Sequence, residues 1–194
     1  MAEVKREYFD SGELKAEWFE INGIKEGMYT EYYEEGNVYF VRNYVNGKLN
    51  GECKGYYLNG QFRRIRNYIN GELNGECRSY IEGRLYDICN YVNGKINGEH
   101  KQYMIGGQLH FINNYVNGIK EGEVKFYHEN GHIEEIGNYV NGKCEGEYNR
   151  YHKNGQLQRN FNYVNGLKEG EMKEYDINGQ LIKITNYVND KEVK

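Results

Sequence analysis

Apolar and aromatic positions recur along this chain with a period of about 24 residues. Tyr dominates the pattern, because 15 of the 21 Tyr residues fall into two columns, and a third column is mainly aliphatic. A Tyr ring packs well on a pleated surface while its hydroxyl stays in water, so such columns are typical of half-buried β-strands. The first Tyr column is Tyr8, Tyr32, Tyr56, Tyr80, Tyr103, Tyr127, Tyr151 and Tyr175; the second is Tyr44, Tyr68, Tyr91, Tyr115, Tyr139, Tyr163 and Tyr187; the aliphatic column is Leu14, Val38, Phe62, Leu85, Leu109, Ile133, Leu157 and Leu181.

One repeat, residues 46–68, predicts two strands and two turns. The first strand is expected over 52–57 and ends at Asn59-Gly60, a dipeptide that tolerates the positive φ of a tight hairpin turn. The second strand is expected from Gln61 to about Tyr68 and ends at Asn70-Gly71. Glycines recur in the same phases throughout, and there is no proline among the 194 residues. A glycine turn about every ten residues leaves no stretch of helical length, so the chain is predicted to be all-β.

The direction of the side chains in the second strand stays open at this level. With strict alternation Leu109 and Tyr115 point to the same face, whereas Ile112 points to the other. Yet Ile112 also belongs to a regular column, with Ile65, Ile88, Ile136 and Ile184. Either both faces are partly covered, or a β-bulge shifts the phase within the strand.

The segment NYVNG or a close variant begins at Asn43, Asn67, Asn90, Asn114, Asn138 and Asn162, and NYVND begins at Asn186, with one spacing of 23 residues. A fixed period of this length indicates a tandem array, in which each copy buries its apolar side against its neighbours. We expect one array over 1–194, with a capping hairpin at 1–23, repeats over 24–189 and a tail at 190–194. Function is then to be sought on a surface.

These repeats resemble the MORN repeats, and more closely the variant class whose units look like NGxxxGExxxYxxNGxL followed by NY. The resemblance extends from about Tyr8 to Tyr187. It implies about eight β-hairpins stacked into one elongated, twisted antiparallel sheet. The classical MORN unit carries Gly-x-Gly where this chain has Gly-Glu, as at Gly51-Glu52. MORN-type arrays look like adaptor and scaffolding modules, the variant class is often labelled antitoxin, and lipid binding is also suggested for MORN repeats.

The charge pattern favours a protein partner over nucleic acid or membrane lipid. The net charge is −4, which gives no electrostatic reason to expect nucleic-acid binding. A lipid-binding face needs a basic stripe along several repeats, but here a Glu column is interleaved with a basic column two residues further on. One basic cluster, Arg63, Arg64 and Arg66, is either a solvated strand face or a contact for an anion or an acidic partner.

No catalytic or cofactor motif is present in the sequence. Cys53 and Cys77 lie one repeat apart, about 9.6 Å by strand spacing, too far for a disulfide, and Cys89 and Cys144 match no pairing pattern. We expect four reduced thiols, two of them packed as small apolar residues. His128 and His152 share a column but are too far apart to bind one metal, and all five histidines are expected at the surface. The sequence predicts no enzyme, no metal site and no cofactor. With no long apolar run and no signal-peptide pattern, we expect a soluble, cytoplasmic protein.

Information about a partner is expected where the repeats differ, since invariant columns build the fold. The most variable columns lie in the second strand, where several members mix aromatic and polar character as interface centres do. The leading hypothesis is a non-enzymatic protein-interaction scaffold that tethers or neutralises a partner; the alternatives are anionic-lipid binding and self-association through open sheet edges. The partner-binding candidates are Tyr39, Phe40, Arg63, Arg64, Tyr86, His110 and Phe111.

Overall fold

The computed structural model describes residues 1–193, all of whose regular structure is β-strand. Contacts divide the chain into unit 1 (Met1–Lys95) and unit 2 (from Ile96), and each unit is described by itself. None of the described residues forms a helix of the length and apolarity needed to cross a bilayer. Because all of the regular structure in residues 1–193 is β-strand, the all-β prediction is confirmed.

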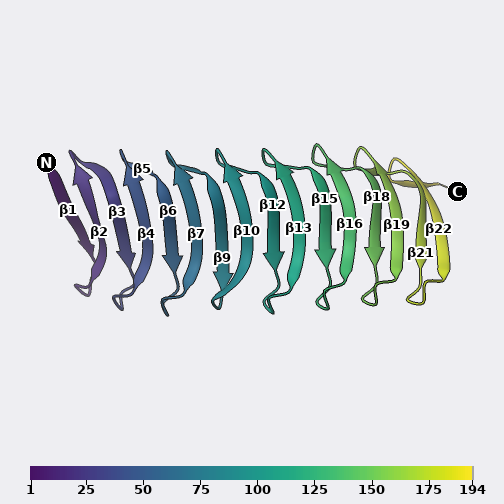
Figure 1. Cartoon of the computed structure of the whole chain (residues 1–194), viewed down its shortest axis with the longest axis horizontal. Coiled ribbons are helices and arrows are strands. Elements are labelled where there is room, and N and C mark those ends of the chain that lie inside the picture. Colours follow the sequence, from purple (N-terminus) through teal and green to yellow (C-terminus); the bar gives the residue numbers. More distant parts are fainter. Residues whose placement is uncertain (194) are drawn as a thin grey trace. The chain divides into compact units, whose positions relative to one another are not determined.

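Unit 1 contains four hairpins, β1–β2, β3–β4, β6–β7 and β9–β10, and each strand pairs antiparallel with the next (Figure 1). The short strands fold back on the end of the long strand before them. The bounds are β1 Ala2–Tyr8, β2 Leu14–Ile21, β3 Ile24–Tyr32, β4 Val38–Val45, β5 Lys48–Leu49, β6 Gly51–Tyr56, β7 Phe62–Ile69, β8 Glu72–Leu73, β9 Gly75–Ile81 and β10 Arg84–Val92; β11 (Lys95–Ile96) contains the unit boundary.

Unit 2 repeats the plan with four hairpins, β12–β13, β15–β16, β18–β19 and β21–β22. The predicted total of about eight hairpins is confirmed. Residues expected as a tail form β23, which pairs with β22. The bounds are β12 Gly98–Tyr103, β13 Leu109–Val116, β14 Ile119–Lys120, β15 Gly122–Tyr127, β16 Ile133–Val140, β17 Lys143–Cys144, β18 Gly146–Tyr151, β19 Leu157–Val164, β20 Leu167–Lys168, β21 Gly170–Tyr175, β22 Leu181–Val188 and β23 Lys191–Val193.

Two kinds of turn join the strands. In the β6–β7 hairpin the Tyr57 N–H donates to Gln61 O at 2.9 Å and only Gly60 has positive φ, at 81°, which is a three-residue loop with a left-handed last residue. The turn after β7 has positive φ at both Asn70 (51°) and Gly71 (90°), the two-residue type that suits right-handed strand twist. The expected positive φ is thus found at Gly60 but not at Asn59.

The single spacing of 23 residues comes from a shortened loop. Between β9 and β10, Arg84 pairs with Ile81, so only Glu82 and Gly83 form the turn. Both have positive φ, 50° and 76°. This hairpin therefore uses a two-residue turn where β6–β7 uses a three-residue loop.

A β-bulge in the second strand of every hairpin resolves the open question of side-chain direction. In β6–β7, Gly55 pairs with Arg64 and Tyr56 pairs with Phe62, so Arg63 has no partner. The same shift occurs in all eight hairpins. The residues left without a partner are Lys15, Tyr39, Arg63, Tyr86, His110, Glu134, Gln158 and Ile182.

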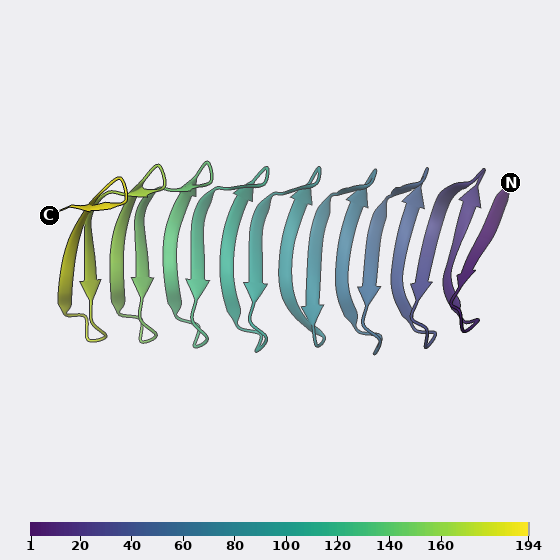
Figure 2. The same cartoon turned by 180° about the vertical axis from the view of Figure 1, so that it is seen from behind.

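The buried residues of the long strands share one face of the sheet in each unit, which we call the core face. Within either unit, no second layer covers a face of the described strands, as Figure 1 and Figure 2 show from opposite sides. Burial comes instead from neighbouring side chains: Lys25 Nζ, for example, lies 4.3 Å from the ring centroid of Tyr29. The most buried residues are Ala16, Tyr29, Phe40, Cys53, Cys77 and Cys89 in unit 1, and Asn113, Val124, Cys144, Met172 and Thr185 in unit 2.

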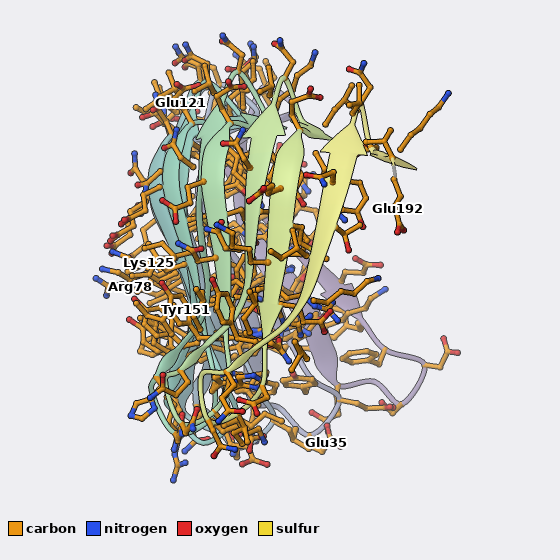
Figure 3. The ribbon with its side chains drawn as sticks, turned by 90° about the vertical axis from the view of Figure 1, so that its right-hand side faces the viewer. Glu35, Arg78, Glu121, Lys125, Tyr151 and Glu192 are labelled. Carbon is orange, nitrogen blue, oxygen red and sulfur yellow. The ribbon has the colours of Figure 1, made fainter. Side chains whose placement is uncertain are left out.

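The opposite face, here called the charged face, carries the interleaved Glu and Lys columns. Five Glu residues of this face form an ion pair with the basic residue two positions on, such as Glu52 with Lys54 at 2.6 Å in unit 1 and Glu123 with Lys125 at 2.5 Å in unit 2. Glu147 instead accepts hydrogen bonds from Asn149 and Asn160. Figure 3 shows Lys125 and Tyr151 projecting from the same side of the ribbon. The charged face is therefore internally neutralised and half-exposed, as expected for a solvated surface.

Candidate functional site

The bulge places the sequence-predicted binding residues. In an unbroken strand consecutive side chains point to opposite faces, but a bulge re-aims one of them. Arg63 and Arg64 show the effect, since both guanidinium groups reach the ring of Phe40. Although Arg63 and Arg64 are consecutive in the strand, both side chains therefore lie toward the core face.

Four of the seven predicted residues come together in unit 1 around the ring of Phe40. The guanidinium carbons of Arg42, Arg63 and Arg64 lie 4.6, 5.1 and 4.6 Å from its centroid. The Tyr39 ring packs edge-on against it, with centroids 4.4 Å apart. Arg66 lines the same small pocket as Phe40 and Arg64. We call this set the arginine cluster: Tyr39, Phe40, Arg42, Arg63, Arg64 and Arg66.

Phe40 itself is 5% exposed. A ring covered to this degree offers no surface to a partner, so Phe40 acts as the platform on which the guanidinium groups stack. The groups available for contact are the half-buried Tyr39, Arg63, Arg64 and Arg66.

Only one cation of the cluster is matched by a carboxylate. Arg42 Nη1 lies 2.8 Å from Glu31 Oε1. Arg63 donates to the Tyr39 hydroxyl at 3.2 Å, and its buried Nε has no hydrogen-bond partner. Burial, followed by the charges of Arg66 and Arg63, lowers the pKa of Arg64. Within residues 1–193, no carboxylate pairs with Arg63, Arg64 or Arg66, so the cluster holds three uncompensated positive charges.

A hollow of about 480 Å³ adjoins the cluster at Tyr39. Its lining is aromatic and acidic rather than basic. The residues that line it are Glu7, Phe9, Lys15, Ala16, Tyr29, Glu31, Tyr32, Tyr33, Glu34, Glu35 and Tyr39. The cluster is thus a local positive patch beside a negative rim.

The other three predicted residues do not join this cluster. Tyr86 is the half-buried bulge residue of β10, and among the described residues no hydrogen bond, ion pair or ring contact joins it to the cluster. His110 and Phe111 belong to unit 2, where the Phe111 ring contacts the rings of His110 at 5.6 Å and Phe126 at 5.9 Å. Four of the seven predicted residues thus form one cluster within unit 1, and two form ring contacts within unit 2.

Unit 2 has a separate open hollow of about 610 Å³ on its core face. The Tyr148 hydroxyl donates to Glu135 Oε2 at 2.7 Å, and burial together with this bond raises the pKa of Tyr148. Arg150 lies 3.3 Å from Glu134 and 3.5 Å from Glu135, and Arg159 lies 2.8 Å from Glu174. Because both arginines of this hollow have carboxylate partners, it has less to gain from an anionic ligand than the arginine cluster.

The cysteines and histidines are more buried than the sequence suggested. All four cysteines are free and buried, where two were expected to be packed. Burial raises the pKa of Cys89 and of Cys144 to about 11. The expectation that all histidines lie at the surface is wrong for His128, whose side chain is 11% exposed and whose Nε2 lies 2.9 Å from Tyr151 O. Tyr57 makes the equivalent bond to Tyr80 O, so His128 acts as a link between repeats.

Sequence reasoning missed Arg42 as a member of the cluster. Arg42 lies two residues after Phe40 on β4, and side chains two apart in a strand share a face. With the bulge placed at Tyr39, this rule puts Arg42 on the same face as Phe40. The same rule applied to the next hairpin puts Arg66 on the same face as Arg64.

Comparison with known proteins shows a family match across much of the chain. The MORN repeat variant matches residues 25–46, 49–70, 120–141, 145–165 and 168–189, together more than half of the 194 residues. No curated protein sequence matches the chain.

Comparison with solved structures finds matches at low identity to parts of much longer chains. The crystal structure of TcdB2-TccC3-Cdc42 is 11% identical, with 95% of this chain and 13% of that chain covered and a TM-score of 0.23. A Photorhabdus luminescens Tc holotoxin pore is 13% identical, with 98% and 13% covered and a TM-score of 0.20. This chain spans only 13% of the length of either, and at such TM-scores the likeness supports no functional conclusion.

Proposed function

The chain belongs to the MORN repeat variant family, and we propose that it is a non-enzymatic scaffold that binds an acidic segment of another protein at the arginine cluster. Repeats of this kind are in general modules for interaction with proteins or lipids. Binding at this surface would tether or neutralise the partner.

The observation that carries the proposal is the set of uncompensated guanidinium groups at Arg63, Arg64 and Arg66. Half-buried like charges destabilise one another and gain from an incoming carboxylate. Arg presents a planar fork that holds a carboxylate through two parallel hydrogen bonds, and stacking on Phe40 already orders the fork. Tyr and Arg are also the residues most enriched at the energetic centres of interfaces.

The acidic rim favours a protein segment over an anionic membrane. Glu7, Glu34 and Glu35 line the hollow beside Tyr39, so a uniformly negative surface laid over the cluster would meet them as well. On the charged face the basic residues are already paired with Glu. A short acidic segment can reach the cluster while its flanks avoid the rim.

The test is a pull-down from the native cell lysate with mass-spectrometric identification. The binding variant is Arg63→Ser with Arg64→Ser, and the matched control is Arg78→Ser, which removes an arginine from the charged face of the neighbouring hairpin. We expect one protein to be enriched with the wild type and the control and lost with the binding variant, and to elute as salt is raised.

A parallel arm uses vesicles of anionic phospholipid at low salt. If the wild type sediments with these vesicles and the binding variant does not, the ligand of the arginine cluster is an anionic lipid and not a protein. Enrichment that survives in the binding variant would remove the arginine cluster as the site.

A further inference from the structure

The arginine cluster encloses a small hollow of its own, separate from the larger hollow beside Tyr39. Its volume is about 40 Å³, and Arg42, Arg64 and Arg66 line it together with Phe40 and Cys53. One ordered water needs about 10–15 Å³, so this hollow has room for about three waters. A ligand group of that size is a small anion or the charged end of a single side chain.

The register of three neighbouring strands explains why arginines surround this hollow. The middle strand, β6, pairs with β4 on one side and with β7 on the other. Cys53 lies opposite Arg66, and Gly55 lies opposite both Phe40 and Arg64. The middle strand thus contributes two small residues to the core face, and the strands that flank it contribute long side chains.

Gly55 keeps the space between Phe40 and Arg64 open. Its φ is not positive, so the backbone conformation does not require glycine there. A Cβ atom at this position would lie 2.6 Å from Phe40 Cε1 and 3.2 Å from Arg64 Cγ. The glycine therefore permits the close approach of these two side chains across β6.

Two of the three arginines that line the hollow have no carboxylate partner. Arg42 is paired with Glu31 at 2.8 Å, whereas within residues 1–193 no carboxylate pairs with Arg64 or Arg66. In unit 2, Arg159 has the position equivalent to Arg64, and it lies 2.8 Å from Glu174. The hollow in unit 1 therefore holds two positive charges that no group of the fold neutralises.

We infer that the acidic group bound by the arginine cluster is a phosphorylated side chain of the partner protein, an inference that rests on the proposed function. A phosphate monoester carries a charge of about −1.5 to −2 at pH 7 and three acceptor oxygens, which matches two unpaired guanidinium groups and a space of about three waters. A carboxylate has a single charge and two oxygens, so it leaves one of the two arginines unmatched. Arg also binds phosphate through two parallel hydrogen bonds.

Other carriers of phosphate fit this surface less well. Nucleic acid and anionic membranes present many negative charges side by side. Charges next to the bound phosphate would meet Glu7, Glu34 and Glu35, which line the hollow beside Tyr39. A single phosphorylated residue reaches the arginines without bringing further negative charge to that rim.

The experiment measures the binding of two capped amino acids to the full-length protein by isothermal titration calorimetry at low salt. The probes are Nα-acetyl-O-phosphoserine amide and Nα-acetylglutamate amide. We expect the phosphoserine probe to bind at least about tenfold more tightly than the glutamate probe. Its affinity should fall between about pH 7.5 and 5.5, because the second pKa of the phosphate group is about 6. Equal affinities for the two probes would overturn the inference.

The binding variants are Arg64→Met and Arg66→Met, which each remove one guanidinium group and keep an apolar stem. Each should weaken the binding of the phosphoserine probe at least about tenfold. The matched control is Arg159→Met, the same exchange at the equivalent position where the arginine has a carboxylate partner, and it should bind the probe like the wild type. Circular dichroism should show that all variants fold. Unchanged affinity in Arg66→Met, or an equal loss in Arg159→Met, would remove this hollow as the site.

Two further arms identify the carrier of the phosphate group. Vesicles that contain phosphatidic acid present a phosphate monoester on a membrane, and we expect the protein not to sediment with them. Sedimentation with these vesicles, without binding of the phosphoserine probe, would mean that the ligand is a lipid. Binding of inorganic phosphate without binding of the phosphoserine probe would show an adventitious ion only. Either result would overturn the inference.

A pull-down from lysate treated with phosphatase separates this inference from the proposed function. Loss of the enriched protein after the treatment supports the inference. Enrichment that survives the treatment contradicts the inference and leaves the binding of an acidic segment intact. No enrichment from either lysate, with the phosphoserine probe still bound, contradicts the proposed function alone.

Discussion

Arg64 is a charged residue whose surroundings oppose its own charge. It is half-buried, stacked on Phe40 and flanked by Arg63 and Arg66, and its pKa is lowered as a result. Side chains that bind a partner are commonly unfavourable for the isolated fold, because the ligand supplies the missing interaction. The arginine cluster has this character.

This reading predicts that removing the charge stabilises the free protein. Arg64→Met keeps the apolar stem over Phe40 and relieves the repulsion, so we expect the free energy of unfolding in urea to rise by about 0.5–1.5 kcal/mol. Arg42→Met is the control, because Arg42 is paired with Glu31 and its loss should lower stability. A loss of stability in Arg64→Met would show that the cation is already satisfied.

Buried tyrosines make the fold sensitive to alkali. Burial, as the largest cause, raises the pKa of Tyr29 and of Tyr163 to about 12. The unfolded chain ionises its phenols near pH 10, so between about pH 10 and 12 the folded state holds protons that the unfolded state releases. Stability is then full below about pH 10 and falls as the pH rises toward 12.

Urea unfolding at pH 8, 10 and 11 measures this loss, which cannot exceed about 1.4 kcal/mol per pH unit for each phenol. Tyr29→Phe should show a shallower decline than the wild type. Parallel declines in the two proteins would mean that the Tyr29 phenol titrates equally in both states.

The sequence assigns each residue type to a column, but it does not predict how deeply the side chain of each member is buried. Phe40 was predicted at a binding surface and is 5% exposed, because three arginines lie over it. His128 was predicted at the surface, but its ring contacts the backbone carbonyl of the next repeat, as the Tyr57 hydroxyl does in an earlier hairpin. Both outcomes depend on groups from the next repeat, the side chains of Arg63 and Arg64 over Phe40 and the backbone carbonyl of Tyr151 at His128, which a single column does not reveal.

At the scale of elements, the turns were predictable because glycine marks the positions where the backbone needs a positive φ, and this requirement is local in the sequence. The hairpins lie where the Gly columns placed them, and β7 is displaced by one residue from its expected start. The bulge was not decidable, because a shift of one residue leaves every column equally regular. It nevertheless fixes which residues face the core, and so it decides the composition of the arginine cluster.

The turn of the β9–β10 hairpin offers a test of element geometry. Glu82 has a φ of 50°, a conformation in which Asn is several-fold enriched and Glu is not. Glu82→Asn should therefore stabilise the protein by about 0.5–1 kcal/mol. The reverse exchange Asn70→Glu, at a φ of 51°, should destabilise it by a similar amount.

Denaturant midpoints with unchanged slopes measure both changes. Equal midpoints for wild type and Glu82→Asn would mean that the turn conformation contributes nothing to stability.

At the scale of the whole molecule, the net charge of −4 conceals a local excess of positive charge in unit 1. For the proposed partner, this patch matters more than the average charge, because charges are screened beyond about 8 Å at physiological salt and act locally. The open end of the sheet in unit 1 is the other molecular feature with consequences. β1 is an exposed edge strand whose charged side chains pair within the hairpin, Lys5 with Glu3 and Arg6 with Glu17.

Charged side chains on an edge strand oppose pairing with a second copy. We therefore expect the sedimentation coefficient of the wild type to be independent of concentration. Lys5→Val with Arg6→Val, which leaves an apolar edge beside Val4, should make it rise with concentration. A wild-type coefficient that already rises would favour self-association.

The measurement that tests the central claim most directly is site-specific photo-cross-linking in the native cell. A benzophenone amino acid replaces Tyr39 at the arginine cluster or, as the matched control, Tyr56 on the charged face; both positions are half-buried tyrosines of unit 1. The account predicts a covalent adduct with one protein from position 39, lost when Arg63 and Arg64 are changed to Ser, and none from position 56. An adduct from position 56 alone, or an adduct at position 39 that persists without the two arginines, would contradict it.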